Sequence, residues 1–446
     1  MRGWTSQRRG QRQDWKGIEP CTRRTSEATS ATDDAGSAGT RATAGTQILA
    51  RRAGLARLAR VISSRVCGAL LFVSFTATCD EFLIEYSIEA SQSYDDNINL
   101  SPNSLSASGT IIALPLKFIR RSERTSYELE AEASAHRYDL DAFNSDNQYL
   151  AGEVSHALGQ GDASLTASFT RDTTRDSEFL DTGVVGPSAS RREKANVLGL
   201  GSWMLNEKHG VIARLEYSDV AYESLRLNDY EYATSYVGWR FQATEQIQWS
   251  LQAGATRFVN DSPVQSLESQ GLSTQGGFKA SLNERLTLSV QGGWINFDNE
   301  LESLTSTASS DSDSASSYLL DSSLNYRAER AQWKVALTRR PTPSGFGVLL
   351  NTSRLDANYS YRASQRLTLE LKAKAGMQES QDPSIGRDRD FINGSARMAY
   401  KFDPHWSLAA SYVYRWQDSE VFSGQADSNA AFISLQYEPL AKTWSR

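Results

Sequence analysis

From Glu85 onward, the chain alternates apolar and polar residues with a period of two. In Arg366–Ala375, every second residue from Leu367 on is Leu or Ala, and the residues between them are Thr, Glu, Lys and Lys. The segments Thr125–Tyr138 and Leu286–Trp294 alternate in the same way. Because successive side chains of a β-strand point to opposite faces, this pattern predicts strands with one apolar and one polar face.

The segments between the predicted strands alternate strictly in length. Eight are short polar turns, such as Asn206–Lys208 and Ser364–Arg366, and nine are longer stretches rich in Ser, Asp, Asn and Gly, such as Thr173–Arg191, Asn260–Glu268 and Asn299–Ala315. A soluble β-sandwich also alternates apolar and polar residues, but it has no reason to sort its loops by end. Short turns at one end, long loops at the other and an even strand number are typical of bacterial outer-membrane barrels.

We therefore predict an all-β fold, a transmembrane antiparallel β-barrel of about eighteen strands, with about sixteen as the alternative if a weak strand is miscounted. The weakest predicted strands are Leu272–Leu282, which is rich in Gly and Gln, and Ile111–Arg120, which contains Pro115. Aromatic residues such as Trp203 and Trp239 fall near strand ends, which is typical of the girdles at a membrane interface. Aromatic caps on a soluble core are the alternative explanation.

The first 79 residues do not follow this pattern. Residues 1–60 are of low complexity and carry 12 Lys/Arg against 5 Asp/Glu, so we predict a disordered segment, and a start codon misassigned upstream of Val61 explains it better than a functional basic tail. The apolar run Val66–Phe75 is shorter than the roughly 20 residues that span a bilayer. Arginines precede it, so residues 61–79 are predicted to be a signal peptide cleaved after Cys79, with a lipoprotein box ending there as the alternative. Residues 80–446 are the predicted barrel.

Charge and cysteine content narrow the range of functions. The whole chain has a net charge of −6 and residues 1–60 have a net charge of +7, so the rest carries −13. This acidic balance argues against a nucleic-acid partner. Cys21, Cys67 and Cys79 are the three cysteines, so a chain cleaved after Cys79 has no thiol nucleophile and no disulfide.

The histidines offer little for catalysis. A barrel hydrolase needs a histidine placed beside a nucleophile or a carboxylate. His156, His209 and His405 fall at predicted short turns, the wrong end of a barrel for this chemistry. His136 is the external candidate, with Asp139 close by in the sequence. Spacing alone fixes no catalytic geometry, so we predict that the protein is not an enzyme and has no catalytic residues.

No pattern of a metal or cofactor site stands out. The acidic stretches Asp95–Asn99 and Asp311–Asp313 lack the spaced ligands and the glycine of a defined Ca²⁺ loop. Solvated turns, which favour Asp and Asn, explain these stretches better. Phosphate-binding loops, zinc spacings and dinucleotide fingerprints do not occur, so we predict no cofactor and no metal.

The polar face of the predicted strands is expected to line a lumen. Its early strands are acidic and its later strands largely basic, so one wall is predicted to be acidic and the opposite wall basic. Such a transverse field favours hydrated solutes, whereas charges that pair across a closed interior would only stabilise the barrel. The predicted lumen-lining residues are Glu128, Glu130, Glu132, Arg214, Arg240, Arg327, Lys334, Arg354, Arg362, Lys372, Lys374, Arg397 and Arg415.

One stretch also resembles a known family. The sequence YSIEASQSYDDNINLSP of Tyr86–Pro102, with Tyr94–Ile98 at its core, resembles the opening strand and first loop of outer-membrane β-barrel porins found among exopolysaccharide-export and exosortase-linked proteins. Phe169–Gly183 resembles a strand end running into an external loop of the same family. The resemblance covers most of residues 85–440 as a layout. It implies an outer-membrane barrel that accompanies polysaccharide secretion, and it supplies no catalytic residues.

Together these patterns predict a porin-like channel for hydrophilic solutes, or an accessory of exopolysaccharide export, in the bacterial outer membrane. A non-conducting barrel that anchors a periplasmic export complex is the main alternative, and a barrel hydrolase is the weakest. The expected partners are outer-membrane lipid and lipopolysaccharide, the barrel-assembly machinery, and polysaccharide or its export complex.

Overall fold

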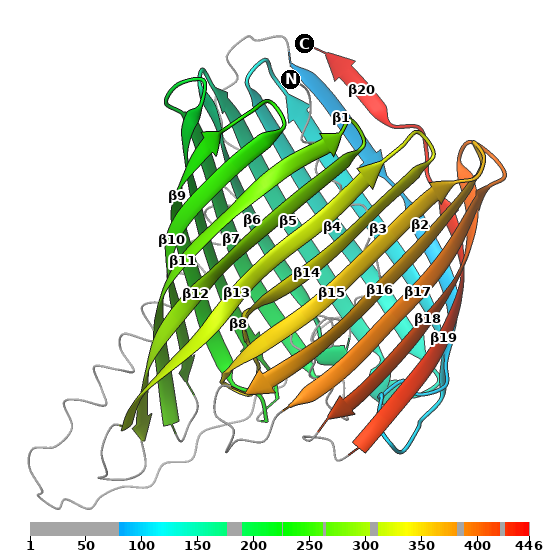
Figure 1. Ribbon diagram of the computed structural model, residues 1–446. Helices are drawn as coiled ribbons and strands as arrows, with labels where there is room; N and C mark the ends of the chain where they lie inside the picture. Colours follow the sequence, from blue (N-terminus) through cyan, green and yellow to red (C-terminus); the bar gives the residue numbers. More distant parts are fainter. Residues whose placement is uncertain are drawn as a thin grey trace, which may run out of the picture. The chain divides into compact units, whose positions relative to one another are not determined.

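The computed structural model describes residues 80–175, 190–224, 226–261, 265–303, 311–380, 388–419 and 424–445. These residues form a single antiparallel β-sheet that closes on itself (Figure 1). The leader and signal peptide predicted for residues 1–79 lie outside the described residues. In the described part, no helix is long and apolar enough to cross a membrane.

The sheet consists of twenty strand segments with one short 3₁₀ helix, η1. In chain order they are β1 (Glu81–Tyr86), β2 (Ile88–Asp95), β3 (Ala107–Arg121), β4 (Thr125–Tyr138), η1 (Asp141–Phe143), β5 (Ser145–Leu158), β6 (Gly161–Thr173), β7 (Arg191–Met204), β8 (His209–Tyr222), β9 (Asp229–Gln242), β10 (Ile247–Asp261), β11 (Gln265–Asn283), β12 (Leu286–Ser303), β13 (Asp311–Arg327), β14 (Ala331–Pro343), β15 (Leu349–Arg362), β16 (Leu367–Ser380), β17 (Arg389–Lys401), β18 (Trp406–Ser419), β19 (Gly424–Tyr437) and β20 (Lys442–Ser445).

The barrel closes between its first and last strands. β2 pairs with β19 and β1 pairs with β20, while β1 and β2 both pair with β3 on their other side. β1 and β2 are therefore one barrel strand, and β19 and β20 are another, so the twenty segments form eighteen barrel strands. The prediction of an eighteen-stranded antiparallel barrel is confirmed.

The interruption of the first barrel strand has a local cause. Ser87 separates β1 from β2 and lies opposite Pro115 of β3, to whose carbonyl oxygen its N–H donates at 3.1 Å. Because proline has no N–H, it cannot return a ladder hydrogen bond. The pairing of β3 stops at Ala113 with β2 and resumes at Leu116 with β1. The weakness predicted for Ile111–Arg120 therefore appears in the neighbouring strand, while β3 itself is continuous.

Connections alternate between the two ends of the barrel as predicted, and the first and last described strands, β1 and β20, pair at the short-turn end (Figure 1). Several of the predicted long loops are shorter than expected. β10 continues to Asp261 and β11 begins at Gln265, inside the predicted loop Asn260–Glu268. β12 and β13 likewise extend into the predicted loop Asn299–Ala315. The polar residues of these segments extend the ladder, with Glu268 paired to Glu300 and Asn299 paired to Asp313, because backbone pairing does not depend on side-chain polarity.

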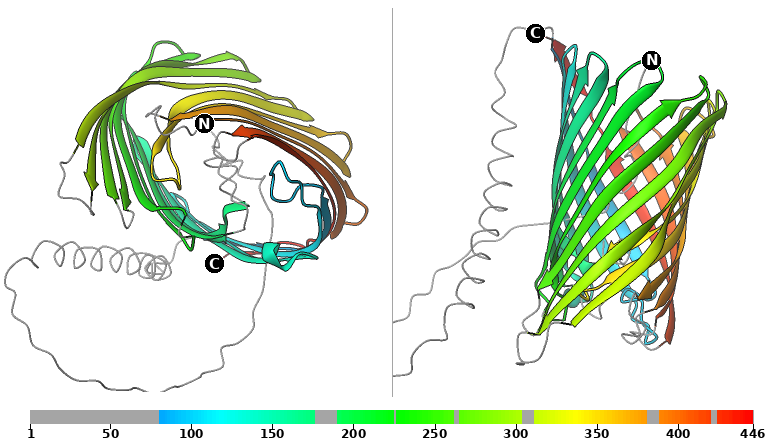
Figure 2. Two further views of the ribbon diagram at one scale, coloured as in Figure 1. Left: turned by 90° about the horizontal axis from the view of Figure 1, so that it is seen from below. Right: turned by 60° about the vertical axis from the view of Figure 1, so that its left-hand side comes forward.

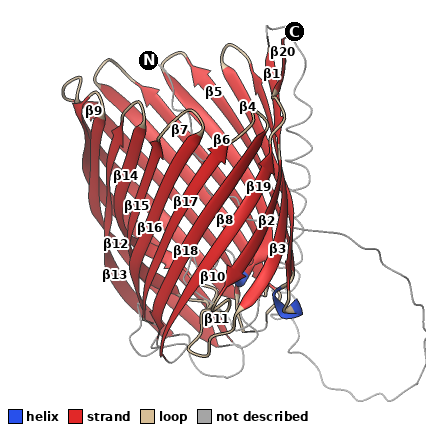
Figure 3. Ribbon diagram, turned by 90° about the vertical axis from the view of Figure 1, so that its right-hand side faces the viewer, coloured by secondary structure: helices blue, strands red, loops and turns tan. Residues whose placement is uncertain are grey.

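The outer face of the barrel is apolar. Large apolar side chains on it are strongly exposed, among them Leu272 (73%), Val237 (62%) and Leu371 (52%). Trp239 and Trp249, near the short-turn end, are also exposed, as expected for an interface girdle. Every barrel strand pairs with a neighbour on each side, so the apolar outer face of the closed sheet can lie in lipid (Figure 3). These features are those of a bacterial outer-membrane barrel, and the outer membrane is where the chain belongs.

Candidate functional site

Strand register places the polar residues of the later strands in continuous rows. Lys334 of β14 pairs with Asn358 of β15, which pairs with Lys372 of β16. One row over, Glu370 of β16 pairs with Arg397 of β17. Directly paired residues of antiparallel strands share a face of the sheet, so these side chains belong to the same face.

Tracing these pairs around the whole barrel puts all thirteen predicted lumen-lining residues on one face. The opposite face carries the exposed apolar side chains such as Leu371. The thirteen residues therefore share the inner face of the barrel wall. That they line a water-filled path stays a prediction.

The charges of this inner face form two arcs. The acidic arc lies on β2 to β6 and includes Glu128, Glu130 and Glu132. The basic arc lies on β13 to β18. The predicted placement of the two arcs on opposite walls is wrong. The shorter way around the barrel from β4 to β16 passes through the pairing of β2 with β19, where the barrel closes. The two arcs approach each other there, which the sequence does not show because closure joins its two ends.

Lys117 of β3 partly neutralises the acidic arc. Its Nζ contacts Glu128 and lies 2.9 Å from Oε1 of Glu130. Lys117 was missing from the predicted lumen residues because β3 carries apolar residues on both faces, with Ile111 inward and Ile112 outward. Lys117 is six residues after Ile111, and residues an even number of positions apart on a strand share a face. This spacing was the signal that could have assigned Lys117 to the inner face.

Asp95 connects the two arcs near the long-loop end. Its carboxylate lies 3.3 Å from Nη1 of Arg415 on β18 and 3.9 Å from Nη2 of Arg175, and it accepts a 2.7 Å hydrogen bond from Oγ of Ser428. The side chain of Asp95 is only 4% exposed. Since Arg415 comes from β18 and Ser428 from β19, this buried cluster ties the first strand to the last two. It also occupies the carboxylate that a Ca²⁺ ion would need at this stretch.

Replacing Asp95 by Ala is expected to destabilise the barrel by about 3–5 kcal/mol, because the guanidinium of Arg415, only 17% exposed, then loses the carboxylate that it contacts. The measurement is the urea midpoint of unfolding, followed by tryptophan fluorescence in detergent. Asp321→Ala is the matched control, since Asp321 is exposed on the inner face and should change stability by about 0.5 kcal/mol or less. Equal midpoints for both variants would contradict a structural role for the Asp95 cluster.

Two loops at the long-loop end turn into the barrel (Figure 2, left). The β2–β3 loop buries Ile98 and Leu100, and Nε2 of Gln417 on β18 donates to the Leu100 carbonyl oxygen at 2.8 Å. The β14–β15 loop, residues 344–348, reaches Asn228 and Asn260. The mouth at this end is therefore narrowed from two sides by described residues.

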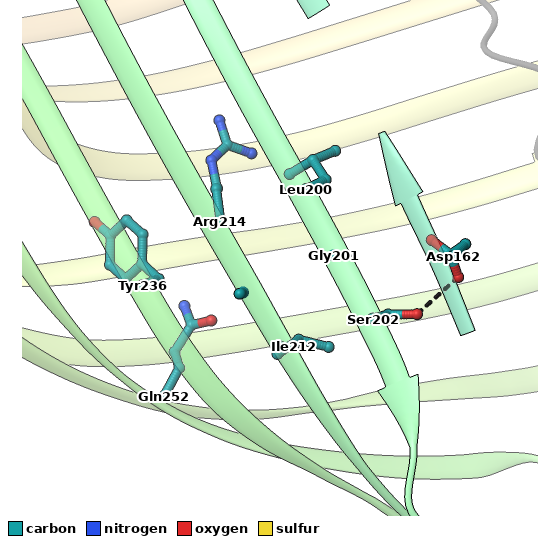
Figure 4. Close-up of a pocket in the computed structure, with 9 residues that line it drawn as sticks. Asp162, Leu200, Gly201, Ser202, Ile212, Arg214, Tyr236 and Gln252 are labelled. Atoms are coloured by element: carbon teal, nitrogen blue, oxygen red, sulfur yellow. Dashed lines mark hydrogen bonds between the residues drawn. The ribbon is translucent and has the colours of Figure 1, made fainter. Parts of the chain in front are cut away.

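A pocket of about 250 Å³ lies on the inner wall over β6 to β10 (Figure 4). Arg214, Tyr236 and Gln252 contribute polar groups, and Leu200 and Ile212 contribute apolar surface. Nη2 of Arg214 is already 2.6 Å from Glu216, so its charge is largely compensated. No His or Cys lines the pocket.

The histidines lie where the sequence indicated. His156, His209 and His405 are at the short-turn end, and His136 lies on the inner face near the long-loop end. His136 is 3% exposed, and the hydroxyl oxygen of Tyr138 lies 3.5 Å from its Nδ1. A solute in the lumen cannot reach so buried a ring. Within the described ranges, no group of three or more His, Cys, Asp or Glu is arranged to hold a metal ion.

Comparison with known proteins gives only distant structural similarity. No family model matches the chain, and no curated protein matches its sequence. The ferric-catecholate import receptor Fiu from E. coli K12, in its open form, is 9% identical over 79% of this chain and 81% of its own, with a TM-score of 0.39. OpdL from Pseudomonas aeruginosa is 12% identical over 80% of this chain and 99% of its own, also with a TM-score of 0.39. At these values the likeness is one of general architecture, and the fold rests on the strand register.

Proposed function

We propose that the protein is a channel that passes hydrophilic solutes across the outer membrane. The observation that carries this proposal is a polar inner face that water can reach. Arg214, Asp321, Lys334 and Asn358 all lie on that face, on four different strands, and are exposed. A barrel of this strand number generally leaves an aqueous lumen, whereas a packed interior would bury such side chains.

The solute is the finer part of the proposal. The resemblance of Tyr94–Ile98 to exopolysaccharide-linked porins supports exported polysaccharide, or an accessory role in its export, as one candidate. Outer-membrane lipid and lipopolysaccharide around the barrel, and the barrel-assembly machinery for its insertion, belong to the same proposal. The absence of an exposed histidine on the described inner face favours transport over hydrolysis.

Planar-bilayer recording tests the channel directly. The purified, folded barrel is expected to insert and to give discrete ohmic current steps in KCl at low voltage. Folding is checked beforehand by the shift in gel mobility on heating. A folded barrel that gives no current over a wide voltage range would refute the channel and favour a structural barrel that anchors a periplasmic export complex.

A further inference from the structure

The β14–β15 loop makes contacts far from its own strands. Residues 344–348 connect β14 to β15, yet the loop reaches the β8–β9 loop and the end of β10. Between these partners and β14 lie β11, β12 and β13. Figure 2 (left) shows the loop inside the ring of strands. It therefore crosses part of the mouth instead of projecting away from it.

Two asparagines hold the loop by its backbone. The N–H of Asn228 donates to the Gly345 carbonyl oxygen at 2.7 Å, and Nδ2 of Asn228 donates to that of Phe346 at 3.3 Å. Nδ2 of Asn260 donates to the Gly347 carbonyl oxygen at 3.0 Å. Asn260 lies on the inward parity of β10 and is fully buried. These contacts place the loop against the inner wall.

An apolar cluster anchors the end of the loop. Leu349, the first residue of β15, is 3% exposed and belongs to a buried cluster with Val220 of β8, Phe258 of β10 and Phe297 of β12. These strands supply inward-facing positions, so the cluster fills the inner side of the mouth. Withdrawing the loop would expose this cluster to water, which favours the seated position.

Gly347 can lie against Asn260 because it has no side chain. Its φ is +80°, a conformation that residues with a Cβ rarely adopt. A Cβ built on it would lie 2.1 Å from Nδ2 and 2.7 Å from Cγ of Asn260. Any larger residue at this position must therefore displace the side-chain amide of Asn260, and with it the hydrogen bond that holds the loop.

We infer that residues 344–348 set the size limit of the channel, and that Asn228 and Asn260 are the positioning residues that hold this loop across the mouth. The inference rests on the proposed function and adds the element that determines which solutes pass. A loop fixed inside the mouth reduces the open cross-section, so it lowers the conductance and excludes solutes that the wall alone would admit.

Gly347→Val tests the size limit. The displaced loop is expected to raise the single-channel conductance several-fold and to admit larger poly(ethylene glycol) molecules, measured by the polymer mass that no longer lowers the current. Gly394→Val is the matched control, because a Cβ at Gly394 meets nothing within 4 Å and its conductance should be that of the parent. Unchanged conductance and polymer cut-off in a folded Gly347→Val barrel would overturn the inference.

A cysteine pair tests the seat without relying on current. Asn260→Cys with Gly347→Cys places two Cβ atoms close enough for a disulfide, and residues 80–446 contain no other cysteine. We expect a disulfide on oxidation, seen as changed gel mobility that reductant reverses, and none in either single-cysteine variant. A double-cysteine barrel that conducts but forms no disulfide would refute the role of the loop and leave the proposed channel intact. Cross-linking in a barrel that never conducts would refute the proposed channel, and the size limit with it.

Discussion

Replacing Lys372, Lys374 and Arg397 together by Glu should move the ion preference of the channel strongly toward cations. The three residues lie side by side on β16 and β17, on the inner face, and register pairs them with Ser395, Asn393 and Glu370. The exchange turns three positive charges into three negative ones on one arc of the lumen. Because the field at a narrow, low-dielectric passage follows its lining charges, the permeability ratio changes with them. The measurement is the reversal potential under a KCl gradient.

Two further variants make that result specific. Gln at the same three positions removes the charges without inverting them and should shift the reversal potential about half as far. Glu128→Gln with Glu130→Gln removes charge from the acidic arc and should shift it in the opposite direction. A folded triple-Glu barrel with the parent's reversal potential would show that the basic arc does not face the ion path.

Leu371→Arg should prevent stable assembly of the barrel. Leu371 is 52% exposed and is the fifth of the fourteen residues of β16, on the face opposite Lys372. A charge on the lipid face costs about 2–4 kcal/mol at the membrane midplane and little near the interfaces. The measurement is the fraction of heat-modifiable barrel after refolding into lipid vesicles, which should fall sharply.

Lys372→Glu, one residue along the same strand, is the matched control. It changes the charge by two units on the inner face, against one unit for Leu371→Arg, and should still leave the folded fraction near that of the parent. Adjacent side chains occupy opposite faces, so a one-residue error in register would exchange the two outcomes. Normal assembly of Leu371→Arg with failure of Lys372→Glu would therefore contradict the inward placement of the charged rows.

The strand pattern was predictable because it is local. Alternation within a dozen residues decides which face of a strand is polar, and no knowledge of the neighbouring strands is needed. Lys372 and Lys374 could therefore be assigned to one face from Arg366–Ala375 alone. Lys117 could not be assigned in the same way, because β3 carries apolar residues on both faces. Its inward-facing apolar residues pack against the β2–β3 loop and against residues of β19.

Loop positions were less predictable. Glycine and the polar residues around it mark 344–348 as a connection, but nothing in the local sequence says that it turns inward. Its seat depends on Asn260, which is 87 residues away from Gly347 in the chain. The extension of β12 and β13 into Asn299–Ala315 was unpredictable for the same reason. Each strand is long because the backbone of the other strand supplies hydrogen-bonding partners along its whole length.

From the sequence alone, the chain is an even-stranded barrel with an apolar outer face, a charged inner face and its ends on the short-turn side. Those properties follow from side-chain periodicity and connection length, which are written residue by residue. Only the tertiary structure brings Asp95 to Arg415, which are 320 residues apart, and so sets the acidic arc beside the basic one at the closure. Closure and the inward loops depend on contacts between distant segments, whose geometry exists only once all eighteen strands have paired.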